Sequence, residues 1–192
     1  ENVAELRSLC REAILVRRDL HGIGPGLLPR ATFGFWSQAM FDEVEFQLDR
    51  RRFDVVQVEY THMAHYLPPP CEGLLRVLVE HDVASVVARR VREAQPTAAR
   101  RFRKWRDELR MIDYETSHVE DADLVVAMSD VDRASLGRRV DPSHVVVVPN
   151  GVSCRDFPAR SEPPEPATIL FVGFFRHDPN VEAVEWFARD RK

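Results

Sequence analysis

The chain has 192 residues, which is enough for one well-buried α/β domain but hardly for two complete ones. Its formal net charge of −4 at pH 7 gives the chain as a whole no electrostatic reason to bind nucleic acid or a membrane surface. The three cysteines form no CxxC pair and no apolar run reaches the length of a membrane helix, so we expect a cytoplasmic protein without a disulfide framework or a metal site.

Apolar segments and polar breaks alternate from the start of the chain. Residues 3–10 have the apolar spacing of the end of an amphipathic helix, and residues 13–16 form a short run typical of a strand. Glycines and prolines over residues 21–30 indicate a loop, and a helix is predicted from about 35 to 51.

Two further strands are predicted over residues 53–60 and 75–79, both rich in β-branched side chains. The first runs into a polar segment with two histidines, and the second ends at Glu-His-Asp. A long helical region over about 84 to 120 follows. We expect it to break near Gln95-Pro96, because proline disrupts the interior of a helix.

The next two predicted strands lie at residues 124–127 and 145–148. Between them Ser129 is an expected N-cap, and the helix that it caps ends near Gly137. The four valines of residues 145–148 fit a strand that is buried on both faces. Strands that alternate with helices in this way predict an α/β fold with a Rossmann-like, doubly wound parallel sheet.

A turn and a proline-rich segment follow this sheet. Pro149 removes a ladder donor, and Asn150-Gly151 supplies a turn that can take positive φ. Residues 169–173 then predict another apolar strand, and Asp178 fits the N-cap of another helix.

We therefore expect three parts. Residues 1–152 form a first Rossmann-like domain that is incomplete at its start, residues 153–167 form a linker, and residues 168–192 form the first βα unit of a second, truncated domain. The chain opens inside an expected helix and stops soon after another has begun, so we expect a fragment. A tight turn within one domain is the alternative, which the proline-rich break disfavours.

Ligands of open parallel sheets bind outside the carboxyl ends of the strands. The polar residues that follow the expected strands are therefore candidates for binding or chemistry. They are Glu59, Thr61, His62, His65, Glu80, His81, Asp82, Ser129, Asp130, Asn150, Arg176 and His177.

Several motifs occur in a specific order. They are Glu-His-Asp at 80–82, Ala-Asp-Leu-Val-Val-Ala-Met-Ser at 122–129, Val-Pro-Asn-Gly-Val at 148–152, Ile-Leu-Phe-Val-Gly at 169–173 and Pro-Asn at 179–180. This set resembles the retaining family 4 glycosyltransferases of GT-B fold, from about residue 53 to the end and more faintly from residue 3. The resemblance implies two Rossmann-like domains that face each other across a cleft. The first would receive an acceptor and the second would bind a nucleotide-diphosphate sugar.

The resemblance places a catalytic histidine at His81, whose imidazole can gain a charge near pH 7. A surface histidine in a turn is the alternative. Asp82 either orients His81 or caps the next helix. Glu59, Thr61 and His62 are acceptor-side candidates, for which a solvated loop is an equal alternative.

The donor side follows from the same resemblance. Asn150 and Gly151 match the hinge between the two domains, and Gly173 and Arg176 match the region that faces the donor diphosphate. Asn180 stands where the family commonly has Lys-Gly, which is a departure from the pattern. The paired glutamates that hold the donor in this family would lie beyond this sequence, so the chain by itself is not expected to turn over.

The resemblance implies an enzyme that moves a sugar from a nucleotide-diphosphate sugar to a hydroxyl acceptor in bacterial polysaccharide, cell-envelope or glycolipid synthesis. We expect no cofactor, no metal and no nucleic-acid partner. Another GT-B enzyme, such as a nucleotide-sugar epimerase, and a non-catalytic α/β binding module are the alternatives.

A basic cluster on the long helical region raises a separate possibility of a peripheral membrane contact at the inner face of the membrane. A solvated helix face is the favoured interpretation, because two acidic residues interrupt the cluster. The cluster consists of Arg100, Arg101, Arg103, Lys104, Arg106 and Arg110, with Phe102 and Trp105 between them.

Overall fold

The computed structural model describes residues 2–17, 28–157, 166–176 and 178–190. The chain divides into two compact units, Glu1–Asn150 and Gly151–Lys192. Most of the predicted loop at 21–30 and part of the predicted linker lie outside the described residues.

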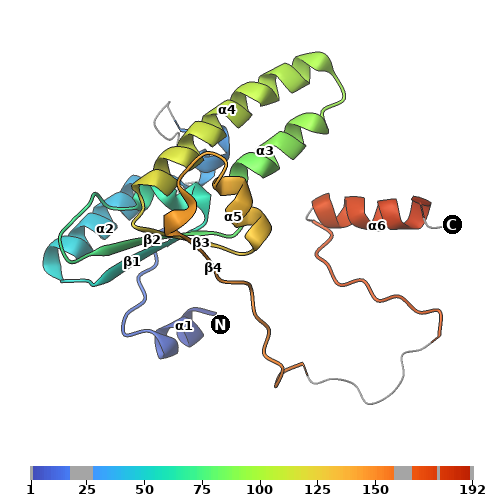
Figure 1. The fold of residues 1–192 in the computed structure, drawn as a ribbon. Coiled ribbons are helices and arrows are strands. Elements are labelled where there is room, and N and C mark those ends of the chain that lie inside the picture. The colour runs from blue at the N-terminus through green and yellow to red at the C-terminus, as the bar shows by residue number, and fades with distance from the viewer. Residues whose placement is uncertain (1, 18–27, 158–165, 177, 191–192) are drawn as a thin grey trace. The chain divides into compact units, whose positions relative to one another are not determined.

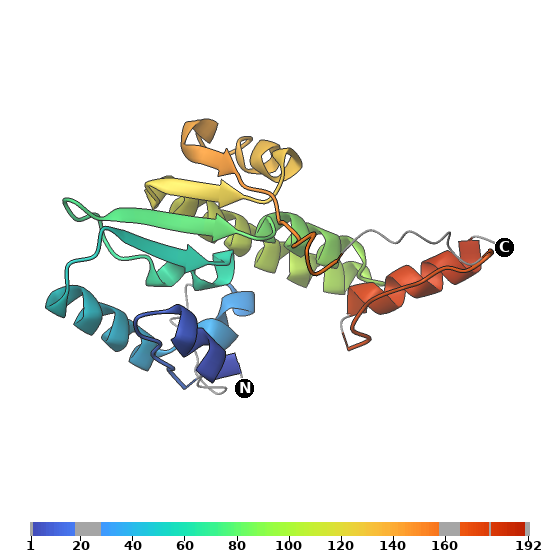
Figure 2. The same ribbon diagram turned by 90° about the horizontal axis from the view of Figure 1, so that it is seen from below.

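The first unit contains a four-stranded parallel sheet in the order β1-β2-β3-β4. Its strands are β1 (Val55–Glu59), β2 (Leu75–Glu80), β3 (Leu124–Ala127) and β4 (Val145–Val147). Figure 2 shows the four arrows side by side and pointing the same way. Glu80 is in register with Ala127, which is in register with Val147. The carboxyl ends of the strands therefore meet at one edge, and the predicted α/β fold with a parallel sheet is confirmed.

Helices connect these strands. Helix α2 (Gln38–Arg50) precedes β1, while α3 (Ala84–Glu93) and α4 (Ala98–Asp121) lead from β2 to β3. The predicted break at Gln95-Pro96 separates α3 from α4. Figures 1 and 2 show these two helices side by side as a hairpin that projects beyond the sheet. The remaining helices of this unit are α1 (Asn2–Leu9), α5 (Asp130–Leu136) and the 3₁₀ helices Arg30–Phe35, Thr61–Tyr66 and Pro142–His144.

The core lies between the sheet and the helices that connect its strands. Strand residues alternate between two faces, so one apolar residue of each strand reaches the same layer. Val58, Leu78, Val125 and Val145 from the strands are buried with Met111, Tyr114 and Val119 of α4 and Leu136 of α5. Within the described ranges, no helix is both long and apolar enough to cross a membrane.

Arg76, which is 3% exposed, joins the starts of β2 and β3. Its Nη1 lies 2.9 Å from Asp121 Oδ2 at the end of α4, and its Nη2 lies 2.9 Å from Asp123 Oδ1 before β3. The hydrogen bonds from Arg76 lower the pKa of Asp123. These paired charges fix the end of α4 against the sheet.

Two sequence predictions within the first unit are wrong. Residues 13–16 are not a strand, and no described strand pairs with them, although the run is apolar. Strand β4 is not buried on both faces, because Val145 is buried whereas Val146 and Val148 are exposed. β4 is the edge strand of the described sheet, and Val146 and Val148 share its uncovered face.

The second unit also differs from the prediction. Residues 169–173 are extended but form no ladder with any described strand, and Leu170 is 85% exposed. The predicted helix is present as α6 (Asp178–Asp190), which already includes Asp178. Gly151 does not take positive φ; the described glycine that does is Gly73.

Candidate functional site

The carboxyl ends of β1 and β2 bring two predicted site residues together. Glu59 ends β1 and His81 directly follows β2, so the parallel register places both at the same edge of the sheet. His81 Nε2 lies 2.7 Å from Glu59 Oε2. A proton on Nε2 is donated to the Glu59 carboxylate in this contact, which fixes the plane of the imidazole.

The ring of Tyr60 lies against one face of the His81 imidazole. The two rings are stacked with 4.1 Å between the ring centroids and 25° between the planes. Tyr60 has φ of +71°, which is a strained conformation for a residue with a Cβ. The backbone N–H of Tyr60 donates to the Val79 carbonyl at 2.9 Å, which helps to hold this conformation.

A buried carboxyl group lies at the same sheet edge. Thr61 donates its hydroxyl hydrogen to Glu80 Oε2, and both side chains are buried. Within the described part of the chain, Glu80 Oε1 has no hydrogen-bond partner. Burial, with a smaller contribution from the negative charge of Glu115, raises the pKa of Glu80 to about 8. Glu80 is therefore mainly protonated at neutral pH, and Thr61 is bonded inward rather than free for a ligand.

Glu115 of α4 is a second buried carboxylate, which the sequence reasoning missed. Ser85 at the start of α3 donates to it from both its hydroxyl and its backbone N–H. Arg139 Nη1 lies 3.4 Å from Glu115 Oε2 and 2.6 Å from Ser85 Oγ. Burial raises the pKa of Glu115 while these partners lower it. Its spacing of four residues from the apolar Met111 and Val119 was the available signal that it faces the core.

His65 is partly buried within this unit and is held by contacts with α4. Its Nδ1 lies 2.9 Å from the Tyr114 hydroxyl, which also accepts the backbone N–H of His65 at 3.0 Å. Burial, with a smaller contribution from the nearby His118, lowers the pKa of His65 to about 4. His65 is therefore neutral at physiological pH and serves packing rather than charge.

A cavity of about 400 Å³ contains two more predicted acceptor-side residues, His62 and Asp82. Burial lowers the pKa of His62, an effect that the charge of Asp82 partly offsets. The other lining residues are apolar groups of α3 and α4 and several charged groups: Pro29, Arg30, Ala31, Ala84, Val87, Ala88, Val91, Lys104, Asp107 and Met111. An apolar wall with a few polar groups suits an organic ligand.

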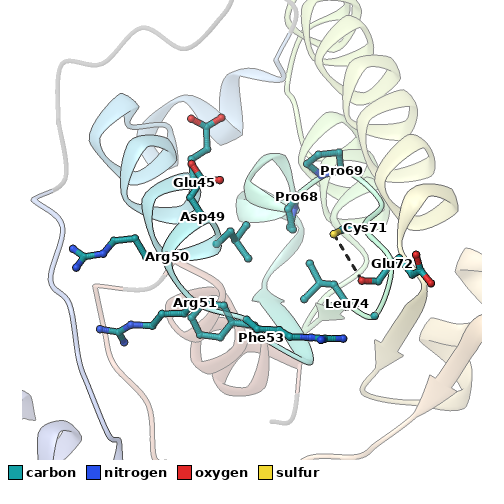
Figure 3. A pocket seen from close by; sticks show the side chains of 13 residues that line it. Glu45, Asp49, Arg50, Arg51, Phe53, Pro68, Pro69, Cys71, Glu72 and Leu74 are labelled. Atoms are coloured by element: carbon teal, nitrogen blue, oxygen red, sulfur yellow. Dashed lines mark hydrogen bonds between the residues drawn. The ribbon is translucent and has the colours of Figure 1, made fainter.

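Another cavity, of about 810 Å³, lies at the amino ends of β1 and β2. Figure 3 shows Phe53, Pro68 and Leu74 between the end of α2 and the loop that carries Cys71 and Glu72. Ligands of parallel sheets bind at the opposite, carboxyl ends. We therefore assign the candidate site to the edge with His81 and not to this cavity.

The predicted donor-side residues belong to the boundary and to the second unit. Asn150 ends the first unit and Gly151 begins the second, and both are exposed. Gly173 and Arg176 are exposed residues of the second unit. A Cβ on Gly173 would lie 2.6 Å from the Phe171 ring, so a larger residue there would require this ring to shift. The donor roles of these residues stay predictions.

Comparison with known proteins gives one finding. The model of the family described as Glycosyltransferase Family 4 matches residues 6–156, which include all four strands and the His81 edge. A search of curated proteins gave no match. In the described ranges, no three His, Cys, Asp or Glu side chains are grouped as metal ligands would be.

Proposed function

The chain belongs to glycosyltransferase family 4, and we propose that it forms the acceptor-binding part of a retaining enzyme that moves a sugar from a nucleotide-diphosphate sugar to a hydroxyl group. The observation that carries the proposal is that the family match spans the sheet whose carboxyl edge holds His81 against Glu59. Polysaccharide, cell-envelope or glycolipid synthesis is the proposed setting. The free and exposed state of all three cysteines supports a reducing cytoplasm.

In the proposed mechanism His81 contacts the reacting substrates, and Glu59 and Tyr60 hold its ring in place. A positioned imidazole can hydrogen-bond the acceptor hydroxyl or the transferred sugar. Arg176 neutralises the departing diphosphate, as a guanidinium does for developing negative charge. The reaction then depends on positioning and charge stabilisation, with no cofactor and no metal.

The test is a transfer assay of the full-length protein that contains this chain, with a panel of nucleotide-diphosphate sugars, read as release of the nucleoside diphosphate. We expect turnover with at least one donor, and a loss of at least about tenfold in kcat for His81→Asn, since a positioned acid–base group contributes on the order of a hundredfold or more. Glu72→Gln, an exposed change at the amino ends of the strands, is the matched control.

Two outcomes would contradict the proposal. If the folded full-length protein neither binds nor turns over any nucleotide-diphosphate sugar, the transferase function is wrong. If His81→Asn transfers sugar as fast as the parent, His81 is not in the site. Urea unfolding of both variants separates a loss of activity from a loss of the folded state.

A further inference from the structure

A smaller cavity, of about 240 Å³, is lined mainly by arginines. It lies beside the cavity of about 400 Å³ that contains His62 and Asp82, which we call the acceptor-side cavity. Arg103, Arg106 and Arg110 come from α4 at spacings of three and four residues, so they share one face of that helix. Arg30 reaches the same cavity from the 3₁₀ helix Arg30–Phe35. Asp107 is the one acidic residue among the lining residues.

Much of the positive charge in this cavity has no ion-pair partner within the described ranges, although Asp107 also lines it. Among the described residues, none of these four guanidinium groups has a carboxylate partner, and the Asp107 carboxylate lies 3.6 Å from Lys104 Nζ. Arginines of the facing helix α3 differ, since Arg89 and Arg92 both pair with Glu108. Four unpaired guanidinium groups around one small cavity favour an anion, and their planar fork matches the oxygens of a phosphate.

This arginine cavity is continuous in its lining with the acceptor-side cavity. Arg30 and Asp107 line both of them. The acceptor-side cavity adds apolar side chains such as Val87 and Met111, and at His62 it reaches the segment that follows β1. A ligand with an anionic group at one end and a hydroxyl at the other fits this sequence of surroundings.

We propose that the acceptor carries a phosphate group, which binds among Arg30, Arg103, Arg106 and Arg110, while its hydroxyl points along the acceptor-side cavity toward the carboxyl edge of the sheet. The identification of this ligand as the acceptor rests on the proposed transferase function. The phosphate site itself rests only on the arginines. Part of the basic cluster on α4 is then a binding surface and not a solvated helix face.

The first test measures anion binding to the chain by calorimetry, with inorganic phosphate and glycerol 3-phosphate as probes and chloride at the same ionic strength as the reference. The double variant R106Q/R110Q should weaken phosphate binding at least about tenfold, since each charged hydrogen bond contributes on the order of 1.5–3 kcal/mol. Arg100→Gln, an exposed change on α4 outside the cavity, should change it less than about twofold. Equal binding by parent and R106Q/R110Q, or equal responses to chloride and phosphate, would overturn the site.

A second arm separates a soluble phosphate from a lipid phosphate. Vesicles of phosphatidylcholine with and without phosphatidylglycerol are sedimented with the parent, with R106Q/R110Q and with the Arg100→Gln control. Binding only to the anionic vesicles, lost in R106Q/R110Q and kept in the control, assigns the phosphate to a lipid. Phosphate binding without vesicle binding assigns it to a soluble acceptor, and the absence of both overturns the proposal.

These measurements do not depend on sugar transfer, so the two proposals can fail separately. Phosphate binding that depends on Arg106 and Arg110, without binding or turnover of any nucleotide sugar, would keep the anion site and remove the transferase function. Turnover that is equal in parent and R106Q/R110Q, together with no phosphate binding, would keep the transferase function and remove the anion site.

Discussion

Replacement of Glu80 by glutamine should change how the stability of the protein depends on pH. Glu80 is fully buried at the end of β2 and accepts a hydrogen bond from Thr61. An amide has nearly the same shape and still accepts from Thr61, but it cannot ionise. Glu80→Gln therefore removes the titration of this group while it keeps the contact.

The sign of the effect follows from the raised pKa. Burial raises the pKa of Glu80 from 4.5 to about 8, so between these pH values the folded state holds a proton that the unfolded state has lost. The stabilisation is complete below pH 4.5 and is lost as the pH rises toward 8. The slope is about 1.4 kcal/mol per pH unit, which amounts to about 5 kcal/mol over the whole window.

Other buried groups contribute to the parent curve. Burial lowers the pKa of His65 from 6.5 to about 4, so this residue stabilises the fold increasingly as the pH rises through that window. Below about pH 6.5 the contribution of His65 to the change of stability with pH therefore has the opposite sign to that of Glu80. Burial raises the pKa of Glu115, which acts in the same direction as Glu80. Because His65 and Glu115 are present in both proteins, the difference between parent and Glu80→Gln isolates the part that depends on Glu80.

The assay is urea unfolding at pH 5, 6, 7 and 8, followed by tryptophan fluorescence and far-UV circular dichroism. The free energy of unfolding of Glu80→Gln should rise relative to the parent by about 4 kcal/mol between pH 5 and 8. Glu72→Gln, an exposed change before β2, should follow the parent curve at each pH. A constant offset between parent and Glu80→Gln would refute the reasoning, since Glu80 would then not titrate in this range.

Three further experiments test the remaining structural statements by urea unfolding. Arg76→Met leaves two aspartates without their shared buried partner and should cost about 3 kcal/mol; a loss below about 1 kcal/mol would contradict the anchoring role. Tyr60→Gly should be more stable than Tyr60→Ala by about 1 kcal/mol, because only glycine takes φ of +71° without strain, and equal stabilities would count against that conformation. Leu78→Ala should cost about 2–5 kcal/mol and Leu170→Ala less than about 0.5 kcal/mol, and similar losses for the two would contradict the assigned core.

Local chemistry explains why most elements of the first unit could be predicted. Pro96 lacks a backbone donor, so the break between α3 and α4 was visible in the sequence. Ser129 caps α5 as expected, because its Oγ accepts the backbone N–H of Asp132 at 3.1 Å. Each of these features depends on residues only a few positions apart.

The segments that were predicted wrongly depend on partners elsewhere in the chain. Residues 13–16 and 169–173 have apolar side chains suited to a strand, but a strand also needs a neighbour that accepts and donates its ladder hydrogen bonds. Among the described residues neither segment has one. An apolar run therefore indicates only that a segment is suited to a strand. Whether it forms one depends on a neighbouring strand with which it can pair.

The candidate site likewise combines features that the sequence predicts with contacts that it does not predict. That polar residues would gather at the carboxyl ends of β1 and β2 follows from parallel topology alone. The pairing of His81 with Glu59 needs the register, and the contact of Arg139 with Glu115 joins the turn after α5 to α4. Sequence spacing carries no information about such contacts.

Contacts at the carboxyl ends of β1 and β2 stabilise the strained backbone conformation of Tyr60. Thr61 turns inward to the buried Glu80, and the residues beside them, Tyr60 and His81, turn outward and stack on each other. The inward hydrogen bond and the stacked rings, with the backbone bond of Tyr60, offset a strain of about 1–2 kcal/mol. Because Glu80 is neutral, it holds Thr61 without placing a second negative charge under the Glu59–His81 pair. The buried contact of Glu80 with Thr61 therefore supports the turn that places Tyr60 against the partly exposed imidazole of His81.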